Sequence, residues 1–222
     1  MKGVNLMDNK NKIIAIQNIS EKNKNFDLPY YIFKRIEENR YQRTSSPMRI
    51  GIKVTNNCLF RCEYCFTQKN EKNISIDTIK KIINELNQIP FEVYLTGGEP
   101  LLHPKIFEII DLFYDWNILL KIHTTGITTK ENIELLNKKI HKIEGIQISI
   151  DSISKFEKIR KSTIKNPLNR IKEFVDGIDV KEKITVNTVV SNYNYTEIKE
   201  IIKNNAENNI DSELKTEWIE SN

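Results

Sequence analysis

The sequence lacks any apolar run long enough to cross a membrane, and it lacks the charged and apolar regions that open a secretory signal. Its longest apolar runs, such as Ile118-Leu119-Leu120, are only a few residues long. Basic residues exceed acidic ones only slightly, 34 to 30, so no surface for nucleic acid is expected. A chain of 222 residues with these absences is expected to be cytoplasmic, with neither a membrane nor a nucleic acid as partner.

Cysteine is equally scarce, and its placement is informative. All three cysteines, Cys58, Cys62 and Cys65, lie within eight residues at C-x3-C-x2-C spacing. A disulfide scaffold needs an even count in a secreted chain, and a zinc site needs a fourth ligand, usually His. No His lies within thirty residues of Cys65. A [4Fe–4S] cube held by only three thiolates would leave one iron open to a substrate or cofactor.

From Met48 onward the sequence alternates between strand-like and helix-like segments. The pattern predicts strands at 50–55, 91–95, 118–123, 146–150, 184–190 and 213–219. It predicts helices from Ser75 to about Leu86 and at 104–114, 130–137, 154–160, 167–175 and 196–205. This alternation predicts an α/β fold with a parallel sheet, and it suits a barrel, a partial barrel or a doubly wound sheet. We expect residues 1–47 to form an N-terminal extension with one short helix over about 28–41, and 48–222 to form the core.

Polar residues follow three of the predicted strands, at the edge where parallel sheets place their sites. Gly97-Gly98-Glu99-Pro100 follows the second strand: the glycines allow a close approach to a ligand, and Glu99 suits an ammonium group. Thr124-Thr125-Gly126 follows the third. Ser149 and Asp151 follow the fourth, where an alternative role for Asp151 and Ser152 is to cap the next helix.

Two further polar residues are candidates for ligand binding. The guanidinium of Arg160 can fork onto a carboxylate, although its neighbours Lys158 and Lys161 also fit a solvated basic face. Asn187 lies inside a predicted buried strand, so its amide needs a partner, and a ligand is one candidate. His123 ends the third strand and is assigned no chemistry.

The C-x3-C-x-aromatic-C loop after a β-branched strand, followed by Gly-Gly-Glu-Pro after the next strand, resembles the signature of the radical S-adenosylmethionine (SAM) superfamily. The resemblance covers the chain from about Met48 and implies a partial (β/α)6 TIM-like barrel. It implies that Cys58, Cys62 and Cys65 hold three irons of a [4Fe–4S] cluster whose fourth iron chelates the amino and carboxylate groups of SAM. Reductive cleavage would then give a 5′-deoxyadenosyl radical that abstracts hydrogen from a substrate. An electron donor such as flavodoxin or ferredoxin is implied as a partner.

The resemblance also implies a role for each candidate side chain in binding SAM. Tyr64 would lie against the adenine, and Gly97, Gly98 and Glu99 would bind the amino group. Thr125 stands where the family commonly has Asn. Ser149 and Asp151 would bind the ribose hydroxyls, and Arg160 the carboxylate, with Asn187 as a further contact.

The motif set is similar to the branch that modifies ribosomal peptides and sulfatases, which implies a peptide or protein substrate. Those enzymes usually carry a C-terminal domain with extra cysteines, and this sequence has none. The alternatives that stay open are a compact member, an enzyme like the activases of glycyl-radical enzymes, a small-molecule enzyme, a fragment and an inactive cluster-binding or SAM-binding remnant.

Overall fold

The structure, a computed structural model, describes residues 47–216 except 63, 66, 87–89 and 163. The predicted N-terminal helix at 28–41 and the last three residues of the predicted strand 213–219 lie outside this part. The described residues form one six-stranded parallel sheet and a two-stranded antiparallel ribbon. The sheet strands, in spatial order, are β1 (Arg49–Thr55), β3 (Glu92–Gly97), β4 (Leu119–Thr124), β5 (Gly145–Ser149), β7 (Ile184–Val190) and β8 (Asp211–Thr216).

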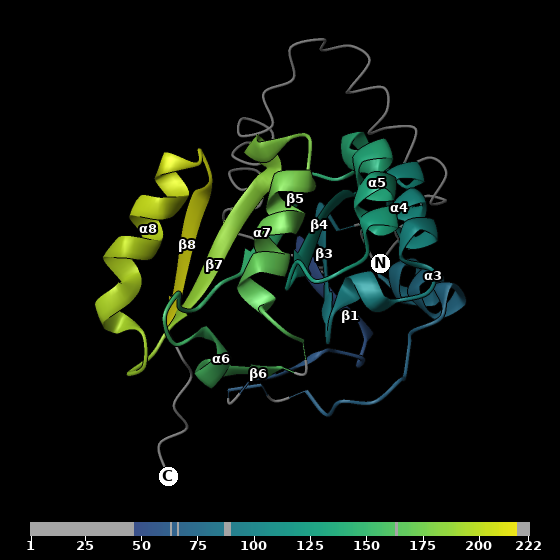
Figure 1. Ribbon diagram of the computed structural model, residues 1–222. Helices are drawn as coiled ribbons and strands as arrows, with labels where there is room; N and C mark the ends of the chain where they lie inside the picture. The colour runs from purple at the N-terminus through teal and green to yellow at the C-terminus, as the bar shows by residue number, and fades with distance from the viewer. Residues whose placement is uncertain (1–46, 63, 66, 87–89, 163, 217–222) are drawn as a thin grey trace, which may run out of the picture.

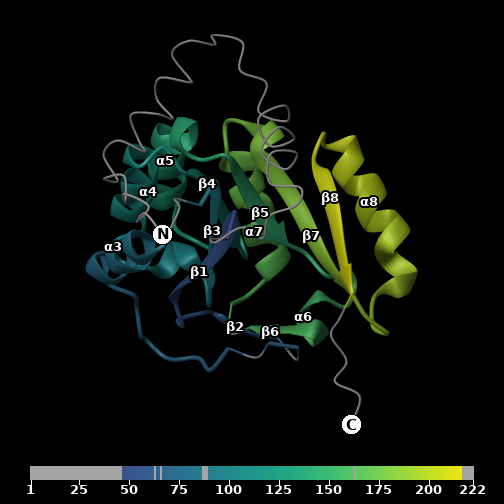
Figure 2. The same ribbon diagram turned by 180° about the vertical axis from the view of Figure 1, so that it is seen from behind.

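Helices connect consecutive strands and cover one face of the sheet (Figure 1), while the view from behind shows the strands in front (Figure 2). The spatial order of the strands follows their order in the chain. A doubly wound sheet would instead reverse its order at a switch point and carry helices on both faces. The predicted α/β class is therefore confirmed, in the strand order of a partial barrel. The helices are α3 (Ile76–Glu85), α4 (Ile106–Asp115), α5 (Lys130–Lys139), α7 (Pro167–Gly177) and α8 (Ile198–Glu207), with 3-10 turns η1 (Pro100–Leu102), η2 (Ile140–Lys142), η3 (Lys181–Lys183) and η4 (Tyr195–Glu197).

Local sequence explains where these elements begin and which side they bury. Helix α3 starts at Ser75, the predicted N-cap, whose side chain accepts a hydrogen bond from Thr78 N at 3.0 Å. Alternate residues of β1, β4 and β5, such as Ile52 and Val54 of β1, are buried beneath the helices. The residues between them point to the opposite side, which we call the inner face of the sheet.

The ribbon was not predicted. Strand β2 (Phe60–Cys62) pairs antiparallel with β6 (Arg160–Ser162), so that Cys62 and Arg160 are register partners. The predicted helix at 154–160 is wrong at both ends, because α6 has only four residues (Phe156–Ile159). The chain leaves the helix at Arg160 because its backbone joins the strand of the cysteine loop. In both ribbon views this pair lies beyond one end of the sheet (Figures 1 and 2).

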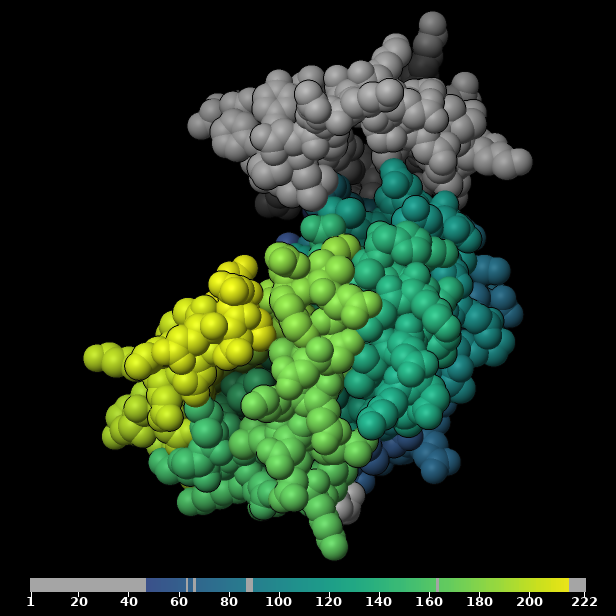
Figure 3. Space-filling model, turned by 45° about the horizontal axis from the view of Figure 1, so that its top comes forward, coloured from purple at the N-terminus to yellow at the C-terminus, as the bar shows by residue number. Residues whose placement is uncertain are grey.

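A hollow separates α7 from α8 on the helix-covered side, and Figure 3 shows it between the green and yellow segments. It has a volume of about 360 Å³, and its lining includes Leu168 and Ile171 of α7 and Ile201 of α8. None of the described helices combines the length and the apolar character that a membrane crossing requires.

Candidate active site

The three cysteines follow β1 and lie on one segment around the ribbon strand β2. Cys58 precedes β2, Cys62 is its last residue and Cys65 follows it. Cys58 is buried, Cys62 and Cys65 are half-buried, and none forms a disulfide. Burial raises the pKa of the Cys58 and Cys62 thiols. Burial acts in the same direction at Cys65, but hydrogen bonds from Lys69 and Thr67 outweigh it and lower the pKa of this thiol. Lys69 Nζ lies 3.0 Å from Cys65 Sγ, so the loop supplies its own cation for a thiolate.

The donor set fits an iron–sulfur cluster better than a single metal ion. The thiols are electrostatic neighbours: besides burial, the charges of Cys58 and Cys65 raise the pKa of Cys62. A single structural zinc normally takes four side-chain ligands, whereas the cysteines of a cube bind separate irons. Three soft thiolates on one short loop match the second arrangement.

The Gly-Gly-Glu-Pro segment lies directly against the start of the cysteine loop. Gly98 N donates to Thr55 O and Glu99 N to Asn57 O, each at 2.7 Å. A Cβ on Gly97, whose φ is +146°, would lie 2.3 Å from Thr55 O, and one on Gly98 would lie 2.0 Å from Asn57 O. The predicted close approach at these glycines is therefore present, but towards the protein's own backbone. Their contact with a ligand stays a prediction.

Glu99 has a set of partners that the sequence did not predict. Glu99 is 1% exposed. One of its carboxylate oxygens accepts hydrogen bonds from Leu101 N (3.0 Å) and Thr124 Oγ1 (2.6 Å). Thr125 donates to the other oxygen through N (2.6 Å) and Oγ1 (2.5 Å). Burial raises the pKa of Glu99, and these hydrogen bonds oppose the shift. The carboxylate thus joins two strand-end loops, and Thr125, predicted to contact SAM, contacts Glu99. Whether Glu99 also receives an ammonium group stays a prediction.

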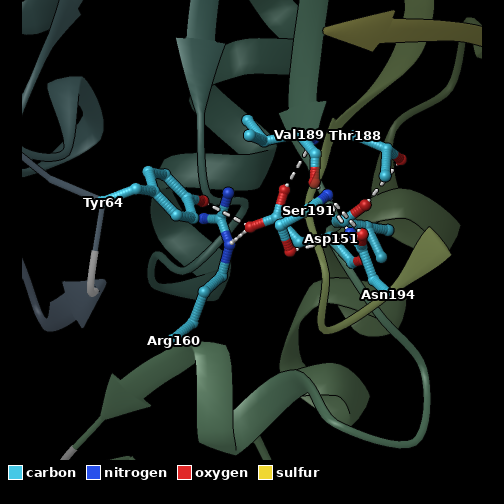
Figure 4. Close-up of polar contacts among 8 residues, drawn as sticks. Tyr64, Asp151, Arg160, Thr188, Val189, Ser191 and Asn194 are labelled. Carbon is cyan, nitrogen blue, oxygen red and sulfur yellow. Dashed lines mark hydrogen bonds and ion pairs between the residues drawn. The ribbon is translucent and has the colours of Figure 1, made fainter. Parts of the chain in front are cut away.

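The buried Asp151 and Arg160 and the half-buried Tyr64 form one polar group (Figure 4), in which Arg160 is the register partner of Cys62. Arg160 Nε lies 2.5 Å from Asp151 Oδ2, and the two side chains are 5% and 0% exposed. The Tyr64 hydroxyl donates to the same oxygen, and Val189 N donates to Oδ1 at 3.0 Å. Burial raises the pKa of Tyr64, which keeps the phenol protonated as a donor. Burial acts to lower the pKa of Arg160, but Asp151, Tyr64 and Cys62 together outweigh burial and raise it.

This grouping changes the roles expected for two residues. Asp151 was predicted to bind ribose hydroxyls, but three protein donors already contact its carboxylate. Arg160 meets Asp151 through its inner nitrogen, Nε. Among the described residues no hydrogen-bond partner contacts its outer nitrogens, so the fork stays available to a ligand carboxylate. The alternative capping role is not found, because the N-cap of α6 is Lys155, whose side chain makes no capping hydrogen bond. Ser152 Oγ instead accepts from the N-cap residue itself, from Lys155 N at 2.8 Å.

Ser149 and Asn187 are register partners on β5 and β7, on the inner face near the end of the sheet. Asn187 is 6% exposed, and its Oδ1 is a buried side-chain atom with no hydrogen-bond partner. Within the part of the chain that the structure describes, it is the one such atom. Buried polar atoms are normally paired, so this acceptor fits a group that a ligand would supply.

Sequence reasoning missed Asn194 and Glu197, in the turn after β7. Both are buried and hydrogen-bond to the segment around Asp151. Their partners lie 43 to 45 positions earlier in the chain. No local pattern in the sequence predicts contacts between residues so far apart in the chain.

A parallel sheet in partial-barrel order, with three thiols at the end of its first strand, defines a class of α/β proteins built around a metal cluster. The chain belongs to the Radical SAM superfamily, whose family model matches residues 52–204. Members of this superfamily are enzymes that use a [4Fe–4S] cluster and SAM.

Curated relatives and solved structures agree with this placement. The chain is 30% identical over 190 residues to a GTP 3',8-cyclase of Clostridium perfringens (strain 13 / Type A), covering 78% of this chain and 56% of the relative. It is 26% identical over 168 residues to an S-adenosylmethionine-dependent nucleotide dehydratase of Fibrobacter sp. (strain UWH6), covering 65% and 48%. The structure of Streptococcus suis SuiB bound to the precursor peptide SuiA matches with a TM-score of 0.65 at 19% identity, covering 87% of this chain and 46% of that one. That likeness shows the fold alone, and the chain spans about half the length of these curated relatives.

Proposed function

We propose that this chain is the catalytic core of a radical SAM enzyme, with Cys58, Cys62 and Cys65 as the cluster ligands. The single observation that carries the proposal is the placement of these thiols. The loop that bears them is held between Gly97-Gly98 on one side and the Arg160 strand on the other. When bound, the cluster supplies the electron that cleaves SAM to the radical that abstracts hydrogen from the substrate.

The chain's own residues would bind and orient SAM. Arg160 offers its outer nitrogens to the methionine carboxylate, because its inner nitrogen is held by Asp151. Tyr64 presents its ring to the adenine while its hydroxyl is anchored on Asp151. The Gly97-Gly98-Glu99 backbone is the candidate contact for the amino group, and Ser149 and Asn187 are candidates for ribose or adenine donors.

The first candidate substrate is a peptide or protein. Support comes from the motif set and from the shared fold with SuiB, which was solved with its precursor peptide. A nucleotide is the second candidate. It is favoured by the names of the two curated relatives, a GTP cyclase and a nucleotide dehydratase, both of which match over more than half of this chain.

The test of the core proposal is iron and SAM binding by the full chain. Anaerobically reconstituted protein should hold about four irons per chain, and its reduced electron paramagnetic resonance (EPR) spectrum should change when SAM is added. Cys58→Ala, Cys62→Ala and Cys65→Ala should each abolish the SAM-sensitive signal. A tightly held single zinc without iron uptake would overturn the proposal.

The substrate candidates are separated by 5′-deoxyadenosine release. Reduced enzyme with SAM is incubated with nucleoside triphosphates or with peptides encoded beside its gene. Deuterium transfer from a labelled substrate into 5′-deoxyadenosine identifies the class that reacts. Transfer from a nucleotide alone would refute the peptide candidate.

A further inference from the structure

Asn194, in the turn after β7, holds the backbone of the site. Asn194 is fully buried, and its Nδ2 donates to Asp151 O at 2.5 Å and to Val189 O at 2.7 Å. Its Oδ1 accepts from Ser191 N at 2.7 Å. Figure 4 shows these contacts around the Asp151 carboxylate. The amide therefore ties the backbone at Asp151 to the end of β7, using both its donor and its acceptor atoms.

Glu197 holds the next three residues of the same segment. Its carboxylate accepts from Ser152 Oγ (2.8 Å) and Ile153 N (2.8 Å). Ser154 donates to it through N (3.1 Å) and Oγ (2.6 Å). Burial acts to raise the pKa of Glu197, but these hydrogen bonds outweigh burial and lower it to about 2. The carboxylate is therefore ionised throughout the physiological range, when its four donors bind it most strongly.

The segment held by Asn194 and Glu197 contains Asp151, the residue that contacts both Arg160 and Tyr64 in the candidate site. Asp151 contacts Arg160 and Tyr64 through one oxygen, and Arg160 is the register partner of Cys62. A buried ion pair is favourable only when its geometry is good and its remaining hydrogen bonds are made. A displacement of the Asp151 backbone would therefore move the Arg160 guanidinium and the Tyr64 phenol, which is part of the cysteine loop.

We infer that Asn194 and Glu197 are positioning residues for SAM: they fix Asp151, and through it they orient Arg160, opposite Cys62, and Tyr64, within the cysteine loop. The inference rests on the proposed function, because it assumes that Arg160 and Tyr64 contact SAM. Neither Asn194 nor Glu197 is assigned a contact with SAM or with the irons.

The test compares Asn194→Ala and Glu197→Gln with Asn204→Ala and Glu200→Gln, two exposed residues of α8. Each full-length protein is reconstituted anaerobically and assayed for iron content, far-UV circular dichroism and SAM affinity by EPR titration. We expect about tenfold weaker SAM binding in the first pair, equivalent to about 1.4 kcal/mol, at unchanged iron content and circular dichroism. The second pair should bind SAM within twofold of the parent.

A combined variant separates positioning through Arg160 and Tyr64 from a general loss of stability. Arg160→Lys with Tyr64→Phe removes the guanidinium and the hydroxyl that Asp151 holds. Adding Glu197→Gln to this background should then weaken SAM binding by less than a further twofold, because coupled residues are not additive. Losses that multiply would overturn the inference.

The remaining outcomes also decide the question. If Glu197→Gln fails to fold, Ser154→Ala is the replacement variant, because it removes only one of the four donors to Glu197. We expect Ser154→Ala to weaken SAM binding about threefold. Unchanged SAM affinity in the folded, iron-loaded variants would overturn the inference while leaving the proposed function intact. A parent protein that takes up iron but does not bind SAM would overturn the proposed function itself.

Discussion

The rings of Tyr94 and His123 lie nearly parallel on the inner face of the sheet, with centroids 4.7 Å apart and planes 14° apart. The Tyr94 ring lies over Gly51 on the neighbouring strand, where a Cβ would lie 2.4 Å from the ring atom Cε2. Three adjacent strands thus share one layered contact, in which the glycine of β1 leaves room for the Tyr94 ring. Stacked rings at this separation stabilise each other beyond the area that they bury.

The position of His123 in this layer predicts a neutral imidazole. Burial lowers its pKa to about 4, and the charge of Lys215 acts in the same direction. Because the unfolded chain titrates near 6.5, the free energy of unfolding should be unaffected by this group above that pH. It should decrease as the pH falls from about 6.5 to 4. Proton NMR of the three histidines should show one that titrates near pH 4, and His123→Gln should remove both that signal and the stability loss. A midpoint near 6.5 for His123 would contradict the prediction.

Glu99→Gln should destabilise the fold as well as weaken SAM binding. An amide nitrogen cannot accept from the Thr124 and Thr125 donors, and each buried donor left unpaired costs about 1–3 kcal/mol. Urea denaturation should therefore show a lower free energy of unfolding, while the exposed Glu108→Gln should be neutral. Weaker SAM binding with unchanged stability would show instead that the carboxylate serves mainly the ammonium group.

Gly98→Ala should be far more disruptive than Gly145→Ala. The new Cβ would meet Asn57 O at 2.0 Å in the first case, but nothing closer than 3.6 Å in the second. Backbone cannot move aside as a flexible side chain can, so a cost of at least about 1–3 kcal/mol is expected at Gly98. Thermal unfolding of the two variants gives the comparison, and equal melting temperatures would refute the close packing of the two loops.

Asp151→Asn should leave the Arg160 charge buried without its counter-ion. Breaking a buried pair in this way costs about 3–5 kcal/mol, whereas the exposed Asp115→Asn should change little. Chemical denaturation measures the difference. A loss below 1 kcal/mol would indicate that solvent reaches Arg160 more freely than its 5% side-chain exposure suggests.

Strands such as β1 and β7 could be predicted because they are rich in β-branched residues, whereas β8, with the sequence DSELKT, starts two residues before the predicted strand 213–219. The predicted strand 184–190, for example, matches β7 residue for residue. The choice between a barrel and a doubly wound sheet could not be made in this way, because both have the same local alternation. Strand order is a tertiary property, and only the resemblance to a family indicated it.

The sequence predicted which residues belong to the site, but it did not predict which of them contact each other. Tyr64, Asp151 and Arg160 were each named, yet their mutual hydrogen bonds join residues 9 and 87 positions apart. The ribbon that brings them together has strands of three residues, too short to show a period. Asn194 and Glu197 escaped notice because an Asn and a Glu in a polar turn look like solvated residues until their distant partners are known.

The ribbon also sets the order in which the cysteine loop can be completed during synthesis. Cys62 leaves the ribosome 98 positions before its partner Arg160 (160 minus 62). At typical synthesis rates this interval is roughly 5 to 20 s. Throughout it the three thiols stand on a chain whose enclosing strand does not yet exist. The thiols are made early and enclosed late, because the strand that pairs with Cys62 cannot close over them until Arg160 has been synthesised.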